Sequence, residues 1–139
     1  LHKEYRRQRQ MCIRDRFEDG HYANAAEDAF VEINDRVKKL FMKVNPTASK
    51  IPDGHTAMNM VFSDNAPLVE FCDRSTETGS NIQKGYMQML AGAMSALRNP
   101  KAHANITITK DDAMRRLMFA SMLMYKIDEA IDYSKIQER

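Results

Sequence analysis

The chain has no tryptophan, few cysteines and no long uninterrupted run of apolar residues. Cys12 and Cys72 are its two cysteines among 139 residues, which excludes a disulfide framework and a cysteine-rich zinc site. The longest mostly apolar run, Leu117 to Tyr125, is far shorter than the roughly 20 residues that a membrane-spanning helix needs. The first residues also lack the apolar stretch of a secretory signal. We therefore expect a cytoplasmic protein with free thiols and no contact with a membrane.

Other absences narrow the function. A glycine-rich loop that cradles phosphates is missing, so a nucleotide-dependent enzyme is not expected. His, Cys, Asp and Glu do not recur at the spacing of metal ligands, so we expect no metal and no cofactor. On the same ground His21 and His55 are interpreted as structural or solvated. The chain has no internal repeat and no low-complexity tract. With 43% hydrophobic residues, including eleven methionines, it has the composition of one globular domain.

The N-terminal segment differs in character from the rest. Residues 11–16 read Met-Cys-Ile-Arg-Asp-Arg and resemble the translated transposase end sequence that sequencing libraries carry. We interpret residues 1–16 as non-native or unstructured and residues 17–139 as the helical domain, with a native basic arm as the alternative. Residues 1–16 carry a net charge of +4 and residues 17–139 a net charge of −2. The basic balance of the whole chain is therefore no argument for nucleic-acid binding, and the authentic protein is expected to extend upstream.

Three segments have the apolar spacing of long helices, 17–44, 80–98 and 109–131. On the first, the pairs Glu32/Arg36 and Asp35/Lys39 are expected on the polar side. The intervening residues predict a turn, a short helix and an extended piece, at 52–54, 56–62 and 67–71. Together these elements predict an all-α bundle of three long helices with one or two short ones.

Details of the later helices carry further expectations. Ser80 and Gln83 have the S-x-x-Q spacing of a capping box, which predicts where the second long helix begins. Gly85 and Gly92 lie inside that helix at a cost of about 1 kcal/mol each relative to alanine, so we expect another helix to approach closely. Thr109 is expected to cap the last helix. Its wide apolar face should pack on two neighbours and comprises Met114, Leu117, Met118, Ser121, Met122, Tyr125 and Ile127.

The candidate site is the segment from Arg98 to His103, which reads RNPKAH. RNA is cleaved without a metal when its own 2′-hydroxyl attacks the adjacent phosphorus, which requires a base, an acid and a fixed cation. Histidine titrates near neutral pH, and the planar guanidinium of arginine fits a phosphate. A helix that ends at Pro100 would hold Arg98 on its last turn and return His103 toward it. Taken alone the signal is weak, because an arginine at a helix C-terminus commonly interacts only with the helix dipole.

Residues 85–103, GYMQMLAGAMSALRNPKAH, resemble the central block of the Ymh-type bacterial family, with its pattern G…L…GA…RNP..H. The resemblance extends to residues 20–25 and to the final helix, and so covers residues 17–131. That family is counted within the HEPN superfamily, whose mark is Arg-x₄₋₆-His with a polar residue after the arginine. The resemblance implies a bundle of four or five helices, often a homodimer that brings two Arg-His sets into one cleft. It also implies RNA-cleaving toxins, phage-defence effectors and RNA-processing enzymes.

Carried over to this chain, the resemblance implies that Arg98 binds and polarises the phosphate and that His103 acts as general base or acid. Asn99 would orient one of these two side chains or the substrate. The expected function is that of a metal-independent endoribonuclease of HEPN type, a toxin or phage-defence effector. RNA is the expected substrate, and the expected partners are a second copy of the chain and an antitoxin or upstream domain. Gly85, Gly92, Ala93 and Ala96 would allow close helix contact in a homodimer. The alternatives are a non-catalytic dimerisation or protein-interaction module and a structural domain attached to an upstream region.

Overall fold

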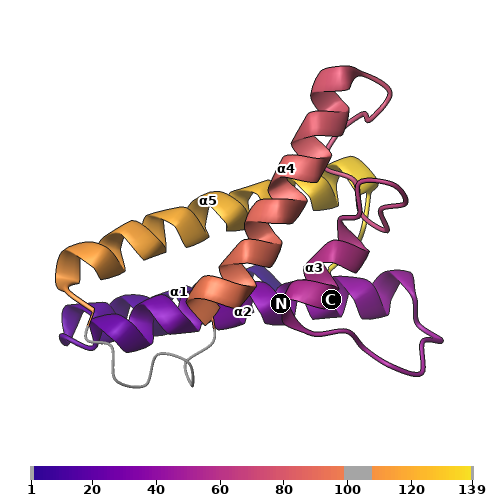
Figure 1. Cartoon of the computed structure of the whole chain (residues 1–139). Coiled ribbons are helices and arrows are strands. Elements are labelled where there is room, and N and C mark those ends of the chain that lie inside the picture. The colour runs from indigo at the N-terminus through magenta and orange to yellow at the C-terminus, as the bar shows by residue number, and fades with distance from the viewer. Residues whose placement is uncertain (1, 99–107, 139) are drawn as a thin grey trace.

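The computed structural model describes residues 2–98 and 108–138. This part of the chain contains helices and no strand, so the all-α prediction is confirmed. Figure 1 shows α2 and α5 alongside each other, with α4 crossing them. None of the described helices is both long and apolar enough to cross a membrane. The elements are α1 (His2–Glu18), α2 (Tyr22–Val44), α3 (Gly54–Val61), α4 (Glu77–Ala93), the π-helical turn η1 (Met94–Arg98) and α5 (Lys110–Ser134).

Helix α2 is the centre of the bundle and packs against α1, α3, α5 and η1. Its apolar residues recur at three- and four-residue steps and are buried, as the sequence predicts. The helix begins at Tyr22 rather than Phe17, because Gly20 adopts a φ of +87° and ends the preceding helix. The buried apolar residues of α2 are Ala25, Ala26, Ala29, Phe30, Ile33, Val37, Leu40 and Phe41.

The N-terminal segment forms a helix, α1, which packs against α2. Ile13 is half-buried and contacts the core, and Arg16 forms an ion pair with Asp28 of α2. Residues 2–18 are therefore helical. The non-native origin of residues 1–16 stays a prediction.

The charge spacing predicts that Arg36 lies on a solvated side of α2, but the residue is buried. Its guanidinium forms ion pairs with Asp128 of α5 and with Glu138, the latter at an Nη2–Oε1 distance of 2.9 Å. The Nη1 atom also donates to the carbonyl oxygen of Met124 at 3.3 Å. Because Glu32 is buried as well, the expected solvated face is part of the junction between α2 and α5.

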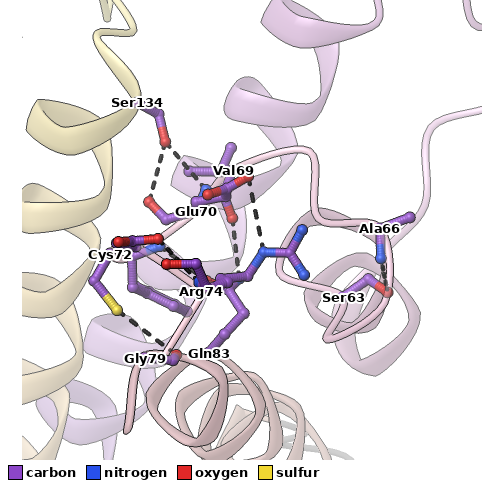
Figure 2. Close-up of polar contacts among 12 residues, drawn as sticks. Ser63, Ala66, Val69, Glu70, Cys72, Arg74, Gly79, Gln83 and Ser134 are labelled. Atoms are coloured by element: carbon purple, nitrogen blue, oxygen red, sulfur yellow. Dashed lines mark hydrogen bonds and ion pairs between the residues drawn. The ribbon is translucent and has the colours of Figure 1, made fainter. Parts of the chain in front are cut away.

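The capping box predicted at Ser80 and Gln83 is wrong. Helix α4 begins at Glu77, and the side-chain oxygen of Thr76 caps it by accepting from the Gly79 N–H at 3.0 Å. The predicted start of α4 was wrong because the Gln83 side chain does not cap the helix. Its side chain is fully buried and binds the loop between α3 and α4 (Figure 2). The amide accepts from the Phe71 N–H at 2.9 Å and donates at 3.1 Å to the carbonyl oxygens of Phe62 and Val69.

That loop contains no strand, although an extended piece is predicted at 67–71. Val69 and Phe71 are nevertheless buried, and the Phe71 ring stacks on Phe62 at a centroid distance of 4.6 Å. Ser134 of α5 binds the loop from the other side, accepting from the Glu70 N–H at 3.1 Å and donating to its carbonyl at 3.0 Å (Figure 2). Hydrogen bonds from the side chains of Gln83 and Ser134 thus satisfy backbone groups that a strand would pair in a sheet.

Helix α5 starts as predicted, with the Thr109 hydroxyl oxygen accepting from the Asp112 N–H at 3.1 Å. Its predicted apolar face is largely wrong, because the core side of the helix consists of Ala120, Leu123, Ile127 and similar residues. Four members of the predicted set are exposed instead, namely Met114, Met118, Met122 and Tyr125.

The expected close approach to the glycines of α4 is also not found within the described chain. A Cβ atom added at Gly85 or Gly92 would meet nothing within 4 Å.

Candidate functional site

Arg98 lies at the end of the π-helical turn η1, which continues α4. Such turns are rare and often occur at functional sites. The side chain is 27% exposed, and its Nη1 atom lies 3.3 Å from Oδ2 of Asp53. The Nη2 atom lies so close to Gly54 that a Cβ there would be only 2.7 Å away. The guanidinium is thus held against the start of α3.

The Asp53–Gly54 step is held in turn by Asn34 of α2. The Asn34 amide donates to Oδ1 of Asp53 at 2.8 Å, and its oxygen accepts from the Gly54 N–H at 2.9 Å. Lys38, one helical turn further along α2, lies 3.3 Å from the same Asp53 oxygen. We call Asn34, Lys38, Asp53, Gly54 and Arg98 the Arg98 cluster.

Electrostatics in the cluster favour an ionised carboxylate. The hydrogen bond from Asn34 lowers the pKa of Asp53 most, and the positive charges of Arg98 and Lys38 lower it further against the opposing effect of desolvation. Two cations therefore share one anion, and the cluster keeps an excess of positive charge. Nε of Arg98 is buried and has no hydrogen-bond partner among the described residues. A buried donor of this kind is unusual in proteins and indicates capacity for a further acceptor.

His55 follows Gly54 directly and is exposed on the first turn of α3. Its Nδ1 atom lies 3.1 Å from the amide nitrogen of Asn59, which leaves Nε2 at the other edge of the ring. The sequence interpretation of His55 as structural or solvated did not anticipate that it adjoins the residue that Arg98 contacts.

Asn99 and His103, the other two predicted catalytic residues, lie outside the described residues. Their roles stay predictions. Ile108, which is described, lines a hollow of about 240 Å³ together with residues 20–24 at the start of α2. His21 lies there and makes no side-chain capping bond to α2. Ile108, five residues after His103, thus adjoins the N-terminal block that resembles the Ymh-type family.

The polar residues Asp73, Ser75 and Glu77 lie at the N-terminal end of α4, whereas Arg98 follows the C-terminal end. About 20 helical residues separate the two, or roughly 30 Å. Asp73 accepts from the Ser75 N–H at 2.9 Å, so its carboxylate closes a local turn. These residues therefore do not border the Arg98 cluster.

Sequence reasoning missed Asn34, Lys38 and Asp53 as members of the cluster. One signal was available for Asn34, since it occupies a position on the apolar stripe of α2 between Phe30 and Val37. A polar residue on a core stripe usually has a specific hydrogen-bond partner. Asp53 gave only a turn signal, because its pairing with Arg98 spans 45 residues.

Across residues 2–98 and 108–138, no three His, Cys, Asp or Glu side chains are grouped as a metal ion would require. Cys12 and Cys72 do not form a disulfide.

Comparison with known proteins supplies the family. No curated protein and no solved structure matches the chain. A family model, Hypoth_Ymh, described as a protein of unknown function, matches residues 9–127. That range contains α2 to α4 and most of α5, together with the segment from Arg98 to His103. The chain therefore belongs to the Hypoth_Ymh family.

Proposed function

We propose that this protein is a metal-independent endoribonuclease of the HEPN type that acts as a toxin or phage-defence effector. Arg98 binds and polarises the scissile phosphate, His103 acts as general base or acid, and Asn99 orients one of them or the substrate. The observation that carries the proposal is the fixed, partly open guanidinium of Arg98. The family match also covers the segment RNPKAH in which that arginine occurs.

A fixed cation is what phosphate chemistry needs from a protein. Electrostatic stabilisation is most effective when the charge is positioned in advance and does not reorganise during the reaction. Asp53 and the Gly54 backbone restrict Arg98 on one side, while the exposed part of the side chain remains for phosphate oxygens. Lys38 provides a second positive charge beside the same carboxylate.

The reaction proceeds by transesterification within the RNA. A base removes the proton of the 2′-hydroxyl, the O2′–P bond forms, and the P–O5′ bond breaks as an acid protonates O5′. The products are a 2′,3′-cyclic phosphate and a 5′-hydroxyl. One histidine cannot perform both proton transfers in the same step. His55, exposed beside Gly54, is the imidazole that we assign to the transfer that His103 does not perform.

The test is cleavage of mixed RNAs in the presence of a chelator, with analysis of the new ends. We expect cyclic phosphate and 5′-hydroxyl ends, and an unchanged rate when the chelator is added. His103→Ala should lower the rate by roughly 10²–10⁴-fold, the usual contribution of a positioned proton-transfer group. His55→Ala should lower it as well, whereas His2→Ala should not. Absence of cleavage by the wild-type protein, or full activity of His103→Ala, would contradict the assignment.

One observation favours the alternative of a protein-interaction module. Large apolar side chains on α5 are exposed, among them Met118 and Tyr125, and such residues are enriched at interfaces. A chain that binds a partner through α5 and cleaves no RNA would fit the module and not the nuclease.

A further inference from the structure

The exposed face of α5 has the spacing of a helix–helix seam. Arg115, Met118, Met122, Tyr125 and Glu129 follow each other at alternating steps of three and four residues, and all are exposed. We call these five residues the α5 seam. Met118 is 66% exposed, Met122 is 46% exposed and Tyr125 is 70% exposed. Such exposure is unusual for three neighbouring large apolar residues on one stripe of a helix.

The seam is distinct from the side of α5 that packs in the core. Ala113, Ala120, Leu123, Ile127 and Ala130 form that side and are almost fully buried against the bundle. The seam is also flanked by hollows. One of about 490 Å³ lies toward α4 and is lined by Tyr86, Met118 and Met122, and another of about 480 Å³ lies toward α1 and is lined by Ile13 and Leu117. Tyr125 borders both. The surface therefore has a ridge with space beside it.

We propose that the occupant of this surface is a second copy of the chain, packed through the α5 seam in antiparallel orientation. A repeat of alternating three- and four-residue steps is the pattern by which two helices interlock their side chains. A two-fold axis near Met122 would place Met118 of each protomer against Tyr125 of the other. A ridge beside a hollow is complementary to a copy of itself under such an axis.

Charge selects both the occupant and its direction. Arg115 lies at one end of the seam and Glu129 at the other. In the antiparallel pair each Arg115 faces the other copy's Glu129, so both ends are attractive. In a parallel pair Arg115 would face Arg115 and Glu129 would face Glu129, and like charges opposed across an interface are destabilising. Beyond these layers the acidic Asp111 and Asp132 oppose like charges at the solvated margin in either orientation, so they do not select the direction.

Existing contacts of the seam do not prevent this pairing. Arg115 binds Asp112, and Glu129 binds Lys126, each at 2.8 Å within the same helix. The Arg115–Asp112 pair is well exposed, as is Glu129. Exposed ion pairs contribute little to stability, so the side chains can turn to a partner at small cost.

The dimer would leave the Arg98 cluster accessible. Helix α5 packs on the side of α2 that carries Arg36, whereas Asn34 and Lys38 hold Asp53. Two residues along a helix correspond to about 200°, so Arg36 and the other two lie on roughly opposite faces of α2. The proposal thus does not depend on the proposed nuclease function, and either can fail without the other.

The first test is the molar mass of the full chain by light scattering at about 100 µM, a concentration at which weak dimers are populated. We expect twice the mass of one chain. Met118→Asp should give a monomer with unchanged helicity by circular dichroism. Met60→Asp, on an exposed methionine of α3, is the matched control and should remain dimeric. A monomeric wild-type protein, or a Met118→Asp variant that stays dimeric, would overturn the proposal.

Charge exchange tests the direction independently of apolar burial. Arg115→Glu and Glu129→Arg should each raise the dimer dissociation constant by about tenfold or more, because each opposes like charges at both ends. The double variant Arg115→Glu/Glu129→Arg should return it to near the wild-type value. If the double variant is as weak as the single ones, the antiparallel pairing is wrong.

Discussion

Gln83 shows how one polar side chain can determine the path of a whole loop. It is fully buried and makes three hydrogen bonds to backbone groups of Phe62, Val69 and Phe71. The sequence offered the residue, but its spacing to Ser80 indicated a helix cap. Local spacing cannot reveal a partner that lies 12 to 21 residues away, so this residue was correctly noticed and wrongly interpreted.

Replacing Gln83 should therefore be costly. Gln83→Leu keeps the size but leaves one N–H and two carbonyl groups buried without a partner, so we expect a loss of about 2–4 kcal/mol in the free energy of unfolding. The measurement is chemical denaturation of the folded chain. Gln88→Leu on the exposed side of the same helix serves as control and should change stability by less than about 0.5 kcal/mol. Equal effects of the two would argue against the hydrogen-bonding role.

Asp53 gives the Arg98 cluster a pH dependence with a definite sign. Its pKa is lowered from the ordinary 3.8, chiefly by the Asn34 hydrogen bond. The folded state thus holds the carboxylate more strongly than the unfolded state does. The stability that results is fully present above a pH of about 3.8 and is lost as the pH falls through the lower folded value.

Carboxyl NMR titration checks this directly. In Asn34→Ala the pKa of Asp53 should rise toward its ordinary value, because the largest favourable contact is removed. Asp73 is an internal control. Its own pKa is lowered by the hydrogen bond from the Ser75 backbone, far from Asn34, and should not move. A pKa of Asp53 that stays low in the variant would show that Asn34 does not hold it.

At the scale of elements, the periodicity of apolar residues predicted which segments are helical. It did not always predict correctly where the helices begin or which faces are buried. The apolar stripe of α2 and the Thr109 cap of α5 are local signals, and both are confirmed. Arg36 and the methionines of α5 were assigned to the wrong sides. A charged residue paired across 92 or 102 residues looks like a solvated one in the sequence. A helix with apolar residues on two faces gives no indication of which face the core will take.

Gly54 joins two of these elements, since it opens α3 with a φ of +56° and lies against Arg98 at the end of η1. Gly54→Ala should destabilise the fold by about 1–3 kcal/mol through backbone strain and the clash. It should also lower any activity that needs Arg98 in place. Gly92→Ala is the matched control, because Gly92 is exposed in α4 with open space around it. That change should stabilise the helix by up to about 1 kcal/mol. Thermal unfolding of both variants measures the two effects. An unchanged stability of Gly54→Ala would contradict the close contact between Gly54 and Arg98.

For the whole molecule, α2 carries a structural network on one face and the Arg98 cluster on the other. The arginine of that cluster was predicted from the sequence, because a motif contains it. Its supporting residues were not, since they come from α2 and the loop before α3 and meet only through folding. The α5 seam was visible in the sequence as methionines, but its exposure depends on how α4 and α5 are arranged.

The measurement that tests the central claim most directly is the single-turnover rate of RNA cleavage by Arg98→Lys. Lysine keeps the charge but loses the planar fork that contacts two phosphate oxygens. If Arg98 stabilises the phosphate in the transition state, the rate should fall by roughly 10²-fold or more, with the fold retained. Arg115→Lys, an exposed arginine on α5, should cleave at the wild-type rate. Full activity of Arg98→Lys and Arg98→Ala alike would contradict a catalytic role for the cluster.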